Sequence, residues 1–178
     1  MDRFRFLYPH LAALAVLLVA ALLYGRAEVF QGMELRAHDD NMWRGAAQEA
    51  MQYEEENGTA PLWSNSMFGG MPMYLVYFKA EGNYVSPIVH QVLSLGLPRV
   101  ALYLWLSMAG FYLFMVALGL RPVTAAASAL AFGFTSYVAV VLGAGHFGKV
   151  LTIAYLPWFL AGVAWVFRKK YLAGAGLA

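Results

Sequence analysis

The stretch that decides the fold is residues 100–120, which read VALYLWLSMAGFYLFMVALGL. It lies between Arg99 and Arg121 and contains no Asp, Glu, Lys or Arg. At about 1.5 Å of rise per residue, a helix of this length spans roughly 30 Å, the thickness of a bilayer's hydrocarbon core. Because backbone polar groups in lipid must be satisfied within their own segment, the stretch predicts a transmembrane helix.

Three further stretches share this character, namely residues 6–25, the run from Pro122 to near Gly145, and residues 150–167. The sequence therefore predicts an all-α membrane protein, a polytopic bundle of transmembrane helices. The chain ends on an apolar run too short to cross a bilayer, so we expect residues 1–178 to be one transmembrane domain at the N-terminus of a longer chain. The expected spans are about 7–24, 100–120, 123–143 and 150–167, with a fifth starting at 172.

The overall composition agrees with this class. Hydrophobic residues make up 61% of the 178 residues and charged residues only 12%, against about 25% charged in an average soluble domain. These values exclude a disordered protein, a basic nucleic-acid-binding module and an ordinary soluble enzyme. Cysteine is absent, which excludes disulfides, thiolate metal sites and a cysteine nucleophile.

Basic residues in the short flanks of the spans predict the orientation. If the N-terminus is cytoplasmic, six of the twelve Lys and Arg residues fall in very short cytoplasmic segments. Most of the others are spread over one long outer loop, which translocates largely regardless of its charge. We therefore expect a cytoplasmic N-terminus. The six cytoplasmic residues are Arg3, Arg5, Arg121, Arg168, Lys169 and Lys170.

The long loop, residues 26–99, is predicted to be extracytoplasmic and functional. It holds nine of the ten acidic residues against five basic ones, a net charge of −4. Loops of this length are usually structured or functional. Residues 41–56 predict a helix capped by Asp39, Asp40 or Asn41 and ended by Asn57-Gly58. Residues 86–97 predict a short interfacial helix before Pro98.

Asp39 and Asp40 form the first candidate site. Adjacent carboxylates near a membrane surface suit a hard divalent cation, Mg²⁺ or Mn²⁺, or one of them suits a general base toward a hydroxyl group. The alternative is that the pair caps the following helix and interacts with its dipole. The neighbouring His38 is either a ligand or an interfacial residue.

A second candidate lies between the third and fourth expected spans, where residues 143–149 read GAGHFGK. His146 and Lys149 are the titratable side chains of this segment, and ionisable groups at membrane depth are often functional. Lys149 suits a phosphate-binding point charge. The alternative is a tight turn whose lysine reaches water. His90 and Arg99 are further sources of positive charge, although structural roles are expected for both.

Two motifs resemble the YfhO-type family of bacterial multispan membrane proteins. One is Pro61-Leu62-Trp63-Ser64-Asn65-Ser66-Met67-Phe68-Gly69-Gly70-Met71-Pro72. The other is Ala131-Phe132-Gly133-Phe134-Thr135-Ser136-Tyr137, followed by Ala144-Gly145-His146 and Lys149. The order of one span, a large outer loop with an early Asp and closely spaced later spans also fits, so the resemblance covers nearly the whole chain.

This family is similar to the GT-C glycosyltransferases, so the resemblance implies a sugar transferase of the bacterial inner (cytoplasmic) membrane. The donor would be a polyprenyl-phosphate-linked sugar and the acceptor a cell-envelope glycan or lipid on the outer face, with membrane lipid but no nucleic acid as partner. Asp39 or Asp40 would be catalytic, and His146 and Lys149 would bind the donor phosphate. The residues expected to cover the site, or to anchor the loop in the interface, are Trp63, Phe68, Gly69, Gly70 and Pro72, with Met71 and Met73.

Two other functions stay open at this point. A non-catalytic envelope-assembly protein would tolerate substitution of both Asp39 and Asp40. A transporter or flippase of lipid-linked glycans would need polar residues near the middle of its spans. The expected spans hold few such residues, which disfavours transport.

Overall fold

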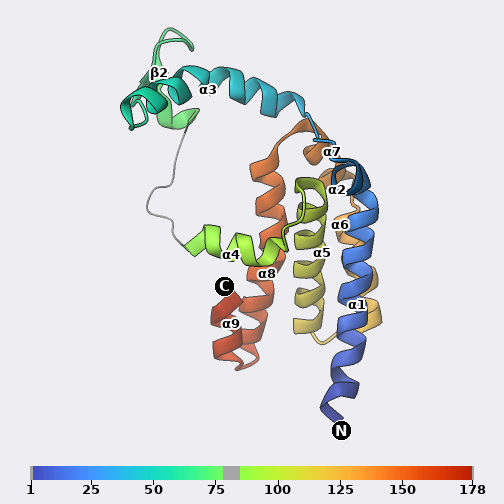
Figure 1. Ribbon diagram of the computed structural model, residues 1–178. Helices are drawn as coiled ribbons and strands as arrows, with labels where there is room; N and C mark the ends of the chain where they lie inside the picture. Colours follow the sequence, from blue (N-terminus) through green and yellow to red (C-terminus); the bar gives the residue numbers. More distant parts are fainter. Residues whose placement is uncertain (1, 78–84, 178) are drawn as a thin grey trace. The chain divides into compact units, whose positions relative to one another are not determined.

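The computed structural model describes residues 2–77 and 85–177, with side chains for residues 7–77 and 87–177. These residues are mostly helical (Figure 1). The chain divides into two compact units. Unit 1 comprises Met1–Leu35 and Gln91–Ala178, and unit 2 comprises Arg36–His90.

Unit 1 contains the long apolar helices. Three helical segments are long and apolar enough to cross a membrane, namely Leu7–Tyr24, Arg99–Ala117 and Phe147–Phe167. They agree with three of the four expected spans. The helices of this unit are α1 (Asp2–Tyr24), α2 (Arg26–Gln31), α5 (Arg99–Ala117), α6 (Pro122–Gly133), α7 (Ser136–Ala144), α8 (Phe147–Phe167) and α9 (Tyr171–Leu177), and α4 (Val85–Ser94) enters the unit at Gln91.

The span expected at 123–143 is not one helix. It is the pair α6 and α7, bent by 41° at a break after Gly133. Gly133 packs closely against α5, since a Cβ at this position would lie 2.4 Å from Met108 Cγ. Thr135 then starts α7 with an extended backbone, and hydroxyl residues in this position compete with the helix for backbone hydrogen bonds. The expectation of a continuous third span is therefore wrong, although α6 and α7 together pass as one broken span.

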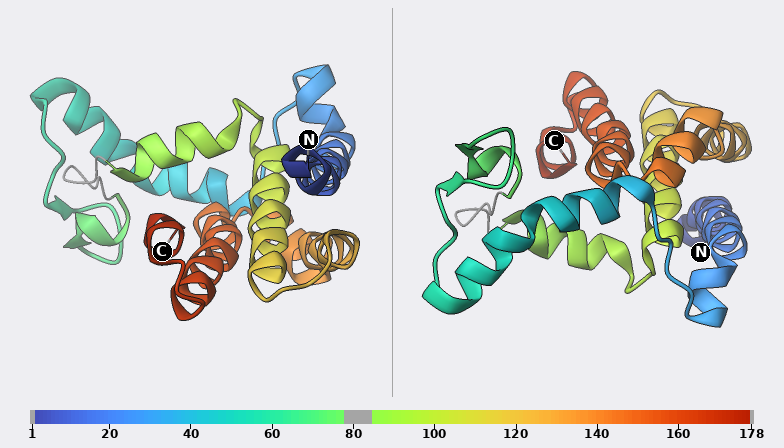
Figure 2. Two further views of the ribbon diagram at one scale, coloured as in Figure 1. Left: turned by 90° about the horizontal axis from the view of Figure 1, so that it is seen from below. Right: turned by 90° about the horizontal axis from the view of Figure 1, so that it is seen from above.

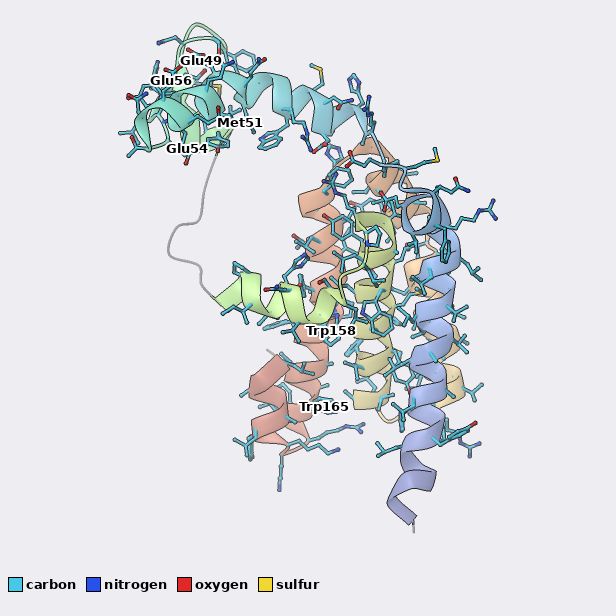
Figure 3. The ribbon with its side chains drawn as sticks, in the orientation of Figure 1. Glu49, Met51, Glu54, Glu56, Trp158 and Trp165 are labelled. Atoms are coloured by element: carbon cyan, nitrogen blue, oxygen red, sulfur yellow. The ribbon has the colours of Figure 1, made fainter. Side chains whose placement is uncertain are left out.

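Helix α5 is the centre of unit 1, because it packs against α1, α6 and α8 (Figure 2). Small residues permit close contacts in membrane helix pairs. At Gly110 the contact is with Trp158 of α8, whose indole would lie 2.3 Å from an added Cβ. The same indole donates its Nε1–H to the Leu106 carbonyl at 2.9 Å, and Figure 3 labels it between the two helices.

A polar pair also joins α1 to α5 within the apolar segments. His10 Nδ1 lies 2.7 Å from the hydroxyl of Tyr112, a side chain that is almost fully buried. The sequence analysis did not single out His10. An imidazole and a phenol that share a hydrogen bond inside a span satisfy each other, which lowers the cost of placing them there.

Unit 2 is built on α3 (His38–Asn57), a hairpin of β1 (Trp63–Ser64) and β2 (Met71–Pro72), and the short 3-10 helix η1 (Met73–Leu75). The strands pair antiparallel, Trp63 with Pro72 and Ser64 with Met71. Two hydrogen bonds tie α3 to the chain after the hairpin: Trp43 Nε1–H to the Val76 carbonyl at 2.7 Å, and the Tyr77 hydroxyl to Glu54 at 2.6 Å.

The expected helix of the loop is confirmed, and so is its end. Gly58 caps α3 in the left-handed conformation and donates its N–H to the Glu54 carbonyl at 2.8 Å. The expected start at Asn41 is wrong, because α3 begins at His38 with Ala37 as its N-cap. The interfacial helix expected at 86–97 corresponds to α4, which ends earlier, at Ser94.

Candidate functional site

Asp39 and Asp40 lie in the first turn of α3, in unit 2. Ala37 is the N-cap of α3, so the expectation that one of the two aspartates is the N-cap residue is wrong, although their position still favours interaction with the helix dipole. Asp40 forms an ion pair with Arg44 at 3.2 Å, and its side chain keeps 17% of its exposure. Both carboxylates remain partly accessible at the start of an otherwise polar helix.

The helical geometry of this pair bears on the expected cation. Successive residues of a helix do not face each other, so the two carboxylates point in different directions. Among residues 2–77 and 85–177, no group of three or more His, Asp or Glu side chains could hold a metal ion. The metal role of Asp39 and Asp40 therefore stays a prediction, and no step below depends on it.

His146 and Lys149 lie in unit 1, where α7 turns into α8. Gly145 ends α7 at a φ of 93°, a conformation that favours glycine, and His146 is the N-cap of α8. The His146 carbonyl accepts the N–H of Val150 at 3.0 Å, which starts the helix. Lys149 follows in the first turn. Both side chains are exposed, so the turn predicted as the alternative is present and leaves them accessible.

Arg99 joins this pair. It is the first residue of α5, and its guanidinium lies 4.2 Å from the centre of the Phe147 ring, the first residue of α8. A cation over an aromatic face within about 6 Å is stabilised by the ring quadrupole. The contact places Arg99 against the first turn of α8, whose N-cap is His146 and which also carries Lys149, at the end of unit 1 where α5 and α8 both begin (Figure 1). We call these three residues the cationic cluster.

The N-terminal end of α8 adds to the positive potential of this cluster, whereas at the start of α5 the N–H of Val100 is already bonded to the Glu28 carboxylate. Each helix start carries backbone N–H groups without helical acceptors and the positive end of the helix dipole. Anions bind readily at such ends. The cationic cluster thus combines an Arg fork, a Lys point charge and a His within one unit, a set that suits a phosphate group.

Glu28 of α2 holds the start of α5 and was missed in the sequence. Its carboxylate accepts the backbone N–H of Val100 at 2.7 Å and that of Leu35 at 3.3 Å. Pro98, the N-cap of α5, has no side chain that can do this. Glu28 is one of nine acidic residues in the expected loop, and no local sequence pattern distinguishes it from the other eight. Its contact with α5 depends on the packing of α2 against α5.

An apolar pocket lies along α7 in the same unit. Its volume is about 90 Å³. Tyr24 and Phe134 contact each other beside it, with ring centres 5.5 Å apart, and both are about half exposed. The pocket lies at the break between α6 and α7, and the remaining lining residues are Leu104, Gly133, Val138, Ala139 and Leu142.

The residues expected to cover the site meet in the hairpin of unit 2. The indole of Trp63 lies against Gly70, where an added Cβ would be 2.9 Å from Nε1, and Trp63 pairs with Pro72 across the strands. Phe68, Gly69 and Gly70 have φ values of 51°, 76° and 120°. A positive φ is strained for a bulky residue such as Phe68. The ring of Phe68 is 91% exposed.

Met73 behaves differently from the other hairpin residues. Its side chain is 1% exposed and forms part of the core of unit 2. It is therefore a packing residue, and the expectation that it covers a site is wrong. His90 belongs to unit 2, whereas the cationic cluster belongs to unit 1.

No protein-family model, curated protein or solved structure matches this chain.

Proposed function

We propose that the chain is a YfhO-type, GT-C-like membrane glycosyltransferase that uses a polyprenyl-phosphate-linked sugar on the outer face of the bacterial inner membrane. The acceptor would be a hydroxyl of a cell-envelope glycan or lipid. The observation that carries the proposal is the cationic cluster, where Arg99 lies 4.2 Å from the Phe147 ring beside His146 and Lys149. A membrane-embedded protein with such a cluster at a helix end is suited to a lipid phosphate.

The distribution of basic residues supports an outward position for the cluster. Arg168 follows α8 and donates to the Leu118 carbonyl at the C-terminal end of α5, at 2.7 Å. Lys169 and Lys170 continue from it, so a group of exposed basic residues lies at the opposite end of these helices from Arg99. In the orientation that the positive-inside rule favours, the larger group is cytoplasmic and the cationic cluster faces outward.

The resemblance to GT-C enzymes, and not a contact between the two units, gives residues of each unit a separate role in this proposal. An acid of α3, Asp39 or Asp40, accepts the proton of the acceptor hydroxyl. The hydroxyl oxygen then forms a bond to the anomeric carbon of the sugar. The bond from that carbon to the phosphate oxygen breaks, and its electron pair stays on the lipid phosphate. Arg99 and Lys149, with His146, stabilise this developing charge.

The pocket along α7 gives the donor lipid a place for part of its chain. Leu142, which lines the pocket, precedes His146 by four residues, across the end of α7 and the turn at Gly145. A lipid phosphate bound at His146 and Lys149 would thus have its first carbons near an apolar pocket. The polar side chains of Ser107 and Thr152 bond carbonyls of their own helices, those of Tyr103 and Gly148.

The acid is tested by transfer assays on the full-length protein with Asp39→Asn and Asp40→Asn. Loss of a general base lowers kcat by about 10²–10⁴-fold, so we expect this loss in one of the two variants. Arg44→Gln is the matched control for Asp40, since it removes the ion pair and keeps the carboxylate. Glu49→Gln, an exposed acid of the same helix, controls for charge (Figure 3).

If both Asp variants keep full activity, the catalytic role belongs to another residue. If Arg44→Gln has the same effect as Asp40→Asn, Asp40 acts through its ion pair and the base is Asp39. Mass spectrometry of envelope glycans in the same strains identifies the sugar and the acceptor. An unchanged glycan profile in a deletion strain would favour an envelope-assembly role over transfer.

The phosphate site is tested by Arg99→Gln and Lys149→Gln. Removing one donor to a developing oxyanion costs about 10²–10³-fold in kcat, so each variant should lose activity on this scale. Lys169→Gln, an exposed lysine at the opposite helix ends, is the control and should have no effect. Full activity in both Arg99→Gln and Lys149→Gln would contradict the proposed phosphate site.

A further inference from the structure

Helix α4 is amphipathic, and the side chains on its apolar side are exposed. At about 100° per residue, Ile88, Val89 and Val92 fall on one arc, and Leu95 continues it just beyond the helix. The opposite side carries His90 and Ser94, and the polar Gln91 lies at the edge of the apolar arc. Among the apolar residues, Ile88 is 63% and Val92 67% exposed. Exposed apolar groups that follow one another along a helix indicate a partner surface.

The C-terminal part of α4 packs on unit 1 through other residues. Leu93 and Leu97 contact a buried group of Leu102, Leu106 and Ala154. In addition, Trp105 Nε1–H donates to the Leu93 carbonyl at 3.2 Å. The side of α4 that carries Leu93 therefore faces unit 1. The arc of Ile88, Val92 and Leu95 lies on another side of the helix and is exposed.

The contact with Trp105 also fixes the depth of this helix. Trp105 lies six residues after Arg99, which is about 9 Å of rise from the start of α5. The end of α4 therefore lies beside the first two turns of a membrane-length helix, and not beyond that helix. Figure 1 shows α4 crossing beside α5. Amphipathic helices that lie in a membrane surface insert their apolar side by about 5–10 Å, which agrees with this depth.

We propose that α4 is an in-plane membrane helix whose apolar arc contacts hydrocarbon chains of bilayer lipid, in the leaflet where α5 and α8 begin. The turn after it, with Leu95 and Gly96 at φ of 52° and 68°, joins it directly to Pro98 and Arg99. Insertion of α4 therefore sets the height of the start of α5. Arg99 is thereby held near the lipid headgroups. This inference does not depend on sugar transfer.

The test uses the absence of cysteine from residues 1–178, and any cysteine elsewhere in the full-length protein is first replaced by serine. Single variants Val92→Cys and Ile88→Cys on the apolar arc, and Gln91→Cys at the polar edge of that arc, are made in the full-length protein and kept in native membrane vesicles. Gln91 is the matched control, because it adjoins Val92 and is also exposed. Each thiol reacts with a charged, membrane-impermeant maleimide, and a second sample carries a nitroxide at the same position.

We expect Gln91→Cys to react rapidly and Val92→Cys and Ile88→Cys to react at least about tenfold more slowly. The thiolate is the reactive form, and a one-unit rise in thiol pKa already lowers its fraction tenfold. All three variants should react equally after unfolding in dodecyl sulfate. The nitroxides at Val92 and Ile88 should collide with oxygen, which dissolves in lipid, and not with a water-soluble nickel chelate.

Two results would overturn the proposal. If Val92→Cys reacts as fast as Gln91→Cys, the arc faces water. If the nitroxide at Val92 is shielded from both oxygen and nickel, protein covers the arc instead of lipid. Leu95→Cys, on the same arc and outside the helix, repeats the measurement should Val92→Cys fail to reach the membrane.

Discussion

Helices α1 and α5 are alike in composition and differ in their surroundings. Their apolar windows have mean hydropathies of 2.0 and 1.9, yet 11% of the α1 window and 61% of the α5 window is buried within the protein. Within Leu7–Tyr24, helix α1 buries only a stripe of Ala13, Leu17 and Ala21, at four-residue spacing. Helix α5 has neighbours on several sides. Mean hydropathy thus shows that a helix suits apolar surroundings. It does not show whether those surroundings are lipid or other parts of the protein.

The largest effect that tests this contrast is expected from truncating one leucine in each helix. Leu106 of α5 is fully buried, whereas Leu11 of α1 is 63% exposed. Leu106→Ala should lower the free energy of unfolding by about 2–5 kcal/mol, because a cavity remains. Leu11→Ala should change it by less than about 0.5 kcal/mol. Unfolding in dodecyl sulfate–detergent micelles measures both; equal losses would mean that α1 has protein neighbours in the folded state.

A smaller effect is expected where α5 approaches α8 most closely. Gly110→Ala inserts a methyl group against the Trp158 indole and should cost about 1–3 kcal/mol in the same unfolding assay. Gly143→Ala is the matched control, since an added Cβ there meets nothing within 4 Å in a helix. The control should be neutral or stabilising by helix propensity. A neutral Gly110→Ala would show that the indole moves aside at little cost.

The smallest effect concerns the hydrogen bond between α1 and α5. A double-mutant cycle of His10→Ala and Tyr112→Phe isolates the interaction across the 2.7 Å contact. Such hydrogen bonds between membrane helices average about 0.6 kcal/mol, so we expect a coupling energy of this size. A coupling near zero would leave the Ala13–Leu17–Ala21 stripe as the main attachment of α1.

The hairpin of unit 2 gives a further contrast, between an exposed and a buried residue of one motif. Phe68→Gly relieves the positive φ and removes the ring, so it should not destabilise the protein. Met73→Ala should destabilise it by about 2 kcal/mol or more, because Met73 is buried. Thermal unfolding measures both. If Phe68→Gly also lowers sugar transfer, the ring has a functional role; destabilisation by Phe68→Gly would mean that the ring packs on the protein.

The sequence by itself determined the features that depend on local composition. Runs without charge at 6–25, 100–120 and 150–167 located the helices that the structure has at 7–24, 99–117 and 147–167, because a helix in lipid needs only an apolar surface and its own backbone hydrogen bonds. Asn57-Gly58 located the end of α3, because a left-handed cap suits glycine. For the GAGHFGK segment the sequence left a phosphate-binding site and a tight turn open as alternatives, and the structure has a turn there.

Only the tertiary structure decided the contacts between distant segments. Glu28 binds the start of α5 across 72 residues, Arg99 lies over Phe147, and Trp158 rests on Gly110. The break of the third span also depends on packing, since Gly133 is held against Met108. Local sequence cannot specify such pairs, because many residues of the same type are equally available and the choice is made by which helix faces come together.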